Sequence, residues 1–273
     1  MDFTLSEEQQ ALVNVTRQFA QKELADYADK IEKTGLPAPG ILLQRFAEMG
    51  FLGVNLPAHY GGGGMSHLDA VLVLEELAKV SVAAAFPVFE SCFGPALAIA
   101  HYGPEQMRSS VLPDVCSGNM IVAVSMSEPQ AGTALTDLKT ELIPNGKSFV
   151  LRGTKRWCSG AGHADAYVVY CRMSDAPGAK GIGAVLVHDG VEGFTFGAPE
   201  EHMGFRGIPS ADIYFDDVNV SADQIIVPAG GFKQLMEAFD LERCGNTTMS
   251  LACAQSAFDL SLIHISEPTR PVL

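Results

Sequence analysis

The chain has little positive charge. It contains 18 lysines and arginines against 32 aspartates and glutamates, which gives a formal net charge of −14 at pH 7. A field of this sign repels the phosphates of nucleic acids and the headgroups of anionic membranes. We therefore expect no nucleic-acid or membrane partner. An anionic ligand must be held by local hydrogen-bond donors, because the overall charge opposes its binding.

Several other features are missing. The six cysteines form no C-x-x-C pair, and no Cys/His cluster has zinc spacing, so we expect reduced, mostly buried thiols and no metal site. The N-terminus lacks the basic and apolar segments of a signal peptide, which favours a cytoplasmic or mitochondrial-matrix location. Residues 80–100 are the most apolar stretch, but Pro87 and Glu90 interrupt it, so buried helices are predicted.

Residues 1–117 have the pattern of an α-helical domain. Ser6 and Gln9 have the spacing of a capping box. Apolar residues at helical spacing predict helices over 39–49, 69–80, 93–101 and 105–116. The glycine-rich segment 57–64 is not followed by Lys-Ser or Lys-Thr, so it predicts a flexible turn rather than a phosphate-binding loop.

From Gly118 to residue 228 the pattern changes to short alternating runs. The predicted strands are 121–126, 139–143, 148–152, 166–171, 182–188, 194–196 and 211–215. Pro144-Asn-Gly146 predicts a tight hairpin. Strands without interleaved helices favour an antiparallel β-sandwich or barrel, and no G-x-G-x-x-G is present, so a Rossmann site is not expected.

A third unit begins after the β domain. Residues 229–260 predict a helix that starts a C-terminal α domain. Residues 261–270 break the helical pattern, and Leu260 to Arg270 resemble translated sequencing-adapter read-through, so we treat residues 261–273 as an artefactual tail.

Two short stretches predict a ligand site. Val124 to Thr133 is a strand that opens into a small-residue loop, whose backbone N–H groups can hold a phosphate or a ring carbonyl. Lys155 to Ser159 contains the only tryptophan, Trp157, whose indole requires a flat partner or a deep pocket. An ordinary turn and a core tryptophan are the alternative interpretation of each stretch alone.

In combination these stretches resemble the acyl-CoA dehydrogenase family. The family pattern T-E-P-x-A-G-S-D, then K-T, then G-T-K-x-W-I-T corresponds to Ser127–Ala134, Lys139-Thr140 and Gly153–Ser159. Further matches include Met203–Gly207 and Asp240-Leu-Glu-Arg243, and the resemblance runs from Phe3 to about Leu260. Ala134 lacks the carboxylate of the pattern, whereas Thr133 and Ser159 keep a hydroxyl.

The resemblance implies FAD as cofactor and α,β-dehydrogenation of an acyl-CoA thioester to the trans-2-enoyl thioester. Glu242 matches the catalytic glutamate of isovaleryl- and long-chain-type members, and a second family location lies beyond this chain. Asp240 and Arg243 match residues near the substrate. A solvated helix face is the alternative interpretation of this motif.

The resemblance also implies a flavin site. Its residues would be Val124, Met126, Ser127, Gly132, Thr133, Trp157, Cys158 and Ser159. Thr133 would also approach the coenzyme A arm. The implied partners are an electron-transfer flavoprotein and further copies of the chain in a dimer or tetramer.

Two alternatives stay open. One is another flavoenzyme on the same scaffold, either an oxidase or monooxygenase or a dehydrogenase of carrier-protein thioesters. The other is a non-catalytic thioester-binding protein, or an inactive fragment that has lost its C-terminal domain.

Overall fold

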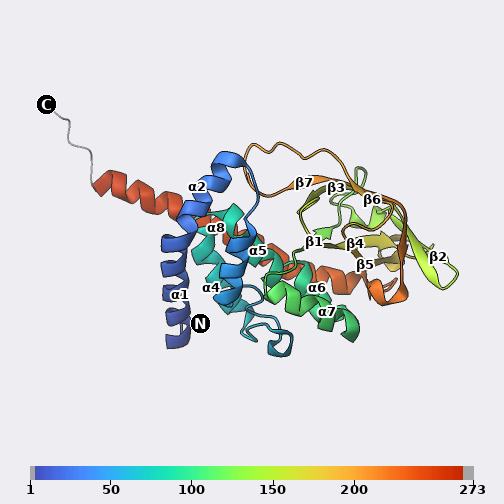
Figure 1. The fold of residues 1–273 in the computed structure, drawn as a ribbon, viewed down its shortest axis with the longest axis horizontal. Helices are drawn as coiled ribbons and strands as arrows, with labels where there is room; N and C mark the ends of the chain where they lie inside the picture. Colours follow the sequence, from blue (N-terminus) through green and yellow to red (C-terminus); the bar gives the residue numbers. More distant parts are fainter. Residues whose placement is uncertain (1–3, 267–273) are drawn as a thin grey trace.

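In a computed structural model of the chain, residues 4–266 are described. They form a helical part, a β-sheet part and one long helix that runs back across both (Figure 1). This order confirms the predicted sequence of a helical domain, a β domain and a C-terminal helix. Phe3, where the family resemblance begins, and residues 267–273 of the predicted tail lie outside the described residues.

The N-terminal part is built of α-helices. Their bounds are α1 Glu7–Phe19, α2 Ala25–Thr34, α3 Gly40–Glu48, α4 His67–Ala78, α5 Val82–Cys92, α6 Pro95–Tyr102 and α7 Glu105–Cys116, with a π-helical turn Ala20–Leu24 joining α1 to α2. The predicted capping box is present, since the Ser6 hydroxyl accepts the Gln9 N–H at 3.2 Å.

The helical part packs around aromatic and aliphatic side chains. The ring centroids of Phe19, Phe46 and Phe51 lie 5.4–6.5 Å apart. The stretch Val82–Tyr102 is apolar and long enough to cross a membrane, but 78% of its apolar window is buried inside the protein. It forms the core helices α5 and α6, as expected because Pro87 and Glu90 interrupt the apolar sequence.

The strands form a mixed sheet. Their bounds are β1 Val122–Ser125, β2 Glu141–Asn145, β3 Ser148–Ser159, β4 Ala166–Arg172, β5 Ile182–His188, β6 Phe194–Phe196, β7 Ser210–Val220 and β8 Ile225–Val227. Within the described residues the order is β6-β7-β3-β2-β4-β5-β8, with β1 beside β4. Most pairs are antiparallel, including the predicted β2–β3 hairpin. However, β1 and β2 run parallel to β4, so the sheet is not purely antiparallel.

Strand β3 is longer than the sequence pattern predicts. Its pairing with β7 is interrupted by register shifts between Leu151 and Gly153 and between Lys155 and Cys158. A bulge inserts an extra residue and shifts the alternation of inward and outward side chains. The alternating pattern in the sequence therefore predicts a shorter strand than the one that pairs in the structure.

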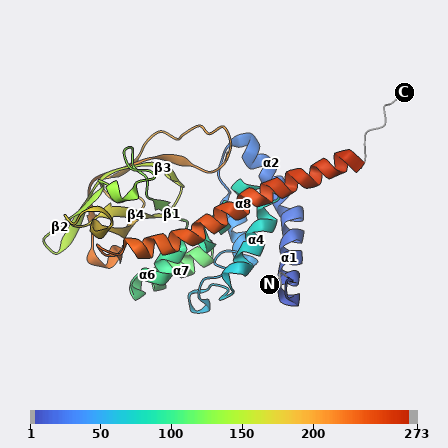
Figure 2. The ribbon, with the colours of Figure 1, turned by 180° about the vertical axis from the view of Figure 1, so that it is seen from behind.

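Helix α8, Phe232–Ser266, connects the two parts. Figure 2 shows it crossing from the sheet to the helical part, where it packs against α4. The prediction that the helical pattern breaks after residue 260 was wrong for residues 261–266. No glycine or proline lies between residues 246 and 267, so nothing in the sequence ends the helix near residue 260.

The glycine-rich segment 57–64 is a packed loop, where the sequence predicted a flexible turn. The Gly63 and Gly64 amides donate to the carbonyls of Gly53 at 3.0 Å and Leu56 at 2.8 Å. A Cβ on Gly62 would lie 2.3 Å from the Leu56 carbonyl oxygen. Close backbone contact therefore explains this glycine.

Gly62→Ala is expected to lower the free energy of unfolding by about 1–3 kcal/mol, because its Cβ would meet a backbone atom. Gly40→Ala is the matched control. A Cβ at Gly40 meets nothing within 4 Å, so this change is expected to be neutral or stabilising by up to about 1 kcal/mol. Urea denaturation of both variants measures the difference, and equal stabilities would contradict the packing argument.

Candidate active site

Two buried charges hold the loop that follows β1. The Lys155 ammonium, on β3, donates to the Glu128 carboxylate and to the Met126 carbonyl, both at 2.9 Å. Lys155 is 0% exposed and Glu128 is 5% exposed. Glu128 also accepts the backbone N–H groups of Lys139 at 2.7 Å and Thr140 at 2.9 Å. Glu128 therefore fixes the turn that follows β1.

The protonation states follow from these contacts. Burial alone would raise the pKa of the Glu128 carboxyl, but Lys155 and the two amides hold that pKa below its usual range. Burial lowers the pKa of Lys155, and the attraction of Glu128 opposes that change. The loop is thus fixed to the sheet by a charged pair that no water reaches.

Beside this loop lies one cleft, which we call the Trp157–Glu242 cleft. It encloses about 180 Å³ of free space. Side chains from β1 and its loop, β3, α5, α6 and α8 line it: Val124, Met126, Ser127, Arg156, Trp157, Cys158, Ser159, Phe86, Phe89, Glu90, Pro95, Phe205, Glu242 and Asn246. The cleft therefore forms only where the helical part, the sheet and α8 meet.

Trp157 presents a flat apolar surface. Its side chain is 61% exposed and its φ of +55° lies in the left-handed region, which a bulky residue rarely adopts. The residue lies in the β3 bulge between Lys155 and Cys158, and bulges redirect side chains. The Arg156 guanidinium lies 4.9 Å from the indole centroid. The strained backbone thus turns the indole out of the sheet, where it lines the cleft.

Glu242 supplies a candidate base. It lies on α8 and is partly buried. Burial raises the pKa of its carboxyl to about 7, although the neighbouring Arg243 acts to lower it. A carboxylate with such a pKa can accept a proton near neutral pH. The indole and this acid lie far apart in sequence and line the same cleft.

The available donors fit a flat heterocycle. Neither the backbone N–H nor the hydroxyl of Ser127 has a hydrogen-bond partner among residues 4–266. Within the same range the Ser159 hydroxyl also has none. Unused donors beside an exposed indole match the polar edge and the apolar face of an isoalloxazine. The chemistry of these residues therefore fits a flavin.

The structure does not bring every predicted site residue into the cleft. It brings together Val124, Met126, Ser127, Trp157, Cys158, Ser159 and Glu242. Gly132 and Thr133 are exposed on the loop, outside the lining. Asp240 and Arg243 are exposed on α8, where Arg243 lies 4.7 Å from the Phe239 ring centroid. Their assigned roles stay predictions.

Sequence reasoning missed part of the lining. Phe86, Phe89 and Glu90 come from α5, and Phe205 comes from the loop before β7. The one sequence feature that pointed to Glu90 was an acid inside the most apolar stretch. Phe205 packs edge-on against Phe86 with centroids 5.6 Å apart, and no pattern in the sequence indicated that contact. Arg206 anchors this loop by donating to the Glu32 carbonyl at 3.0 Å.

Known proteins match the chain over most of its length. The family profile of the acyl-CoA dehydrogenase N-terminal domain matches residues 6–119, and that of the middle domain matches residues 123–218. Acryloyl-CoA reductase (NADH) of Anaerotignum propionicum is 33% identical over 98% of this chain and 68% of the relative. A 3-sulfinopropanoyl-CoA desulfinase of Paraburkholderia xenovorans is 35% identical over 95% of this chain and 68% of the relative.

A solved structure shares the fold. Butyryl-CoA dehydrogenase from Megasphaera elsdenii superimposes with a TM-score of 0.92 at 27% identity, over 100% of this chain and 72% of that chain. The chain therefore spans about two thirds of the length of the relatives it matches.

Lys155→Met is expected to lower the free energy of unfolding by about 3–5 kcal/mol, because it leaves the Glu128 carboxylate buried without its counter-ion. Arg152→Met is the matched control, since the ion pair of Arg152 with Asp217 lies on the surface. Its effect is expected to be far smaller. Thermal and urea denaturation compare the two. A Lys155→Met loss as small as the control's would show that the pair does not hold the loop.

Proposed function

This chain belongs to the acyl-CoA dehydrogenase family, and we propose that the Trp157–Glu242 cleft binds FAD and an acyl-CoA thioester for oxidation at the α,β-carbon pair. The observation that carries this proposal is the placement of an exposed indole, unused hydrogen-bond donors and an acid with a raised pKa around one small cleft. The product is the trans-2-enoyl thioester.

Glu242 is the proposed base. Removal of a proton from the α-carbon of a thioester is most efficient when the pKa of the acceptor lies near the working pH. The pKa of about 7 therefore makes Glu242 suitable at neutral pH. The partly buried position of Glu242 excludes much of the water that would otherwise compete for the proton. When bound, FAD supplies the hydride acceptor that protein side chains lack.

The proposed flavin site follows the cleft wall. The backbone of Met126 and Ser127 would bond the polar edge of the ring, and the Ser159 hydroxyl would donate to a ring nitrogen. Trp157 would cover one face, while Val124 and Cys158 would fill the apolar side. Burial raises the pKa of the Cys158 thiol to about 12, so it packs as a small neutral group. Gly132 and Thr133 would approach the diphosphate from outside.

We propose a short acyl group. Phe86, Phe89 and Pro95 line the cleft beside Glu242 with apolar surface. The names of two similar proteins, an acryloyl-CoA reductase and a butyryl-CoA dehydrogenase, also refer to short acyl groups. Asp240 and Arg243, exposed on α8, would lie along the coenzyme A arm.

The proposed partners come from the family. An electron-transfer flavoprotein would reoxidise the flavin, and copies of the chain would assemble into dimers or tetramers.

FAD is expected to quench the fluorescence of Trp157, since flavins absorb where indole emits and the chain has one tryptophan. Adenosine monophosphate, which lacks the ring, is the control and should not quench. A fluorescence titration at fixed protein concentration measures the affinity. Equal fluorescence with and without FAD would contradict a flavin site formed by these residues.

Glu242→Gln is expected to keep FAD quenching and to slow flavin bleaching by butyryl-CoA by at least about a hundredfold, because the amide cannot accept the α-proton. Glu237→Gln, on the same helix, is the control. Anaerobic absorbance traces measure the rate. If Glu242→Gln bleaches as fast as the unaltered chain, the base lies elsewhere.

The bleaching rate is expected to depend on pH through Glu242. The base acts when ionised, so the rate should rise as pH increases through about 7 and should fall about tenfold per unit below that value. Initial bleaching rates at a series of pH values measure this dependence. A rate that stays constant well below pH 7 would exclude Glu242 as the titrating base.

A further inference from the structure

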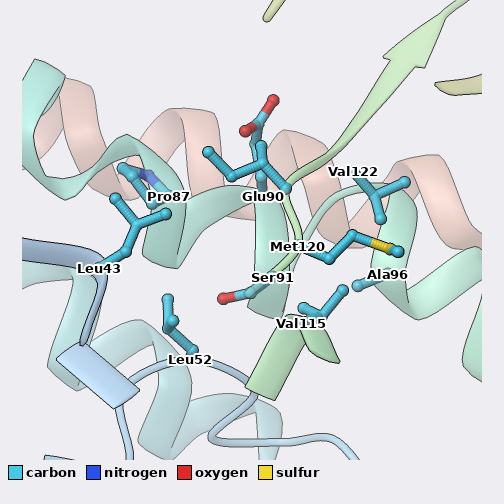
Figure 3. Close-up of a pocket in the computed structure, with 10 residues that line it drawn as sticks. Leu43, Leu52, Pro87, Glu90, Ser91, Ala96, Val115, Met120 and Val122 are labelled. Atoms are coloured by element: carbon cyan, nitrogen blue, oxygen red, sulfur yellow. The ribbon is translucent and has the colours of Figure 1, made fainter. Parts of the chain in front are cut away.

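Glu90 is a second acid in the Trp157–Glu242 cleft. It lies on α5, is 8% exposed, and lines the cleft with Glu242. Figure 3 shows Glu90 among the residues that line a small apolar cavity, with its carboxylate pointing away from Leu52 and Ser91. One carboxylate oxygen would lie 3.8 Å from a Cβ built on Gly160. The acid group therefore lies next to the end of β3.

Within residues 4–266 the Glu90 carboxylate forms no hydrogen bond and no ion pair, and it borders the cleft. The other buried glutamates are paired: Glu76 bonds Arg17 and Lys79, each at 2.8 Å, and Glu128 bonds a buried lysine. A buried carboxylate without a counter-ion is strongly disfavoured, whereas a buried carboxylic acid is not.

Among the described residues, no lysine or arginine forms an ion pair with Glu90. Of the groups that face it, Glu242 on α8 carries a like charge, and Arg156 on β3 forms its ion pair with another acid. Cys158 is a buried thiol whose pKa is raised to about 12. His163 lines a neighbouring cavity with Glu90, and burial lowers its pKa, which favours its neutral form. Glu242, in contrast, has Arg243 beside it.

We propose that Glu90 is a positioning residue that keeps its proton while Glu242 is ionised, so that the cleft holds one negative charge and one neutral hydrogen-bond donor. Two carboxyls that share a site lose their protons in separate steps, and the one beside a cation ionises first. Burial raises the pKa of Glu90 well above its usual range, and the charge of Glu242 raises it further.

The catalytic consequence rests on the proposed function. Removal of the α-proton places negative charge on the thioester, and a second carboxylate nearby would oppose it in a partly buried cleft. A neutral acid does not oppose this charge and can donate a hydrogen bond to it. The proton arrangement itself requires neither FAD nor thioester.

Infrared difference spectroscopy of the chain tests this arrangement. At about pH 8.5, above the pKa of Glu242, the carbonyl stretch of a protonated carboxylic acid is expected in the unaltered chain and in Glu242→Gln. The band is expected to disappear in Glu90→Gln. Glu76→Gln is the matched control, since Glu76 is equally buried but ion-paired, and its substitution should remove no acid band.

Trp157 fluorescence against pH gives a second measurement. Its transition near pH 7, from Glu242, should stay within about 0.3 pH unit in Glu90→Gln, because a neutral amide replaces a neutral acid. A downward shift of about one unit or more would mean that Glu90 is ionised, and would overturn the proposal. Absence of an acid band from the Glu242→Gln spectrum would also overturn it.

These two measurements test the protonation of Glu90 separately from the proposed binding of FAD and acyl-CoA. Glutamine matches the shape of a protonated glutamate, so Glu90→Gln should fold. If it does not, the Glu242→Gln spectrum still decides whether another acid keeps its proton. Neither measurement uses flavin or acyl-CoA, so a chain that fails to bind FAD would leave the result on Glu90 intact.

Discussion

The site depends on the buried ion pair between Lys155 and Glu128. The lysine fixes the Met126 carbonyl, and the glutamate fixes the amides of Lys139 and Thr140, so two segments far apart in sequence are held against β3. A charged pair is geometrically demanding and tolerates few alternative arrangements. The ion pair therefore holds the backbone donors of the loop in one position in the absence of a ligand.

Two residues after Lys155, strand β3 constrains its backbone instead of burying a charge. Lys155 is buried and paired, whereas Trp157 is exposed with a backbone in the left-handed region. The bulge that produces this conformation is sustained by regular pairing of β3 with β7 on both sides of it. Local strain is tolerated where the surrounding structure determines the conformation, and here it turns an indole away from the sheet.

Some of these features were visible in the sequence. The capping box at Ser6, the hairpin at Gly146 and the motif around Ser127 and Trp157 depend on residues close together in the chain, so spacing predicted them. Glu90 and Phe205 enter the cleft through packing between distant elements, which no local pattern encodes. The end of α8 was misjudged because unpacked residues can continue a helix when no glycine or proline stops it.

Acidic residues act differently on the surface of the protein and in its buried cleft. An exposed surface of net negative charge opposes an anionic ligand, so attraction cannot come from the whole protein. In the cleft and the loop beside it, glutamates behave differently: Lys155 keeps Glu128 ionised, the pKa of Glu242 lies near neutrality, and Glu90 is buried without an ion-pair partner among the described residues. Three glutamates therefore have three different protonation behaviours, set by the cation that each one can or cannot reach.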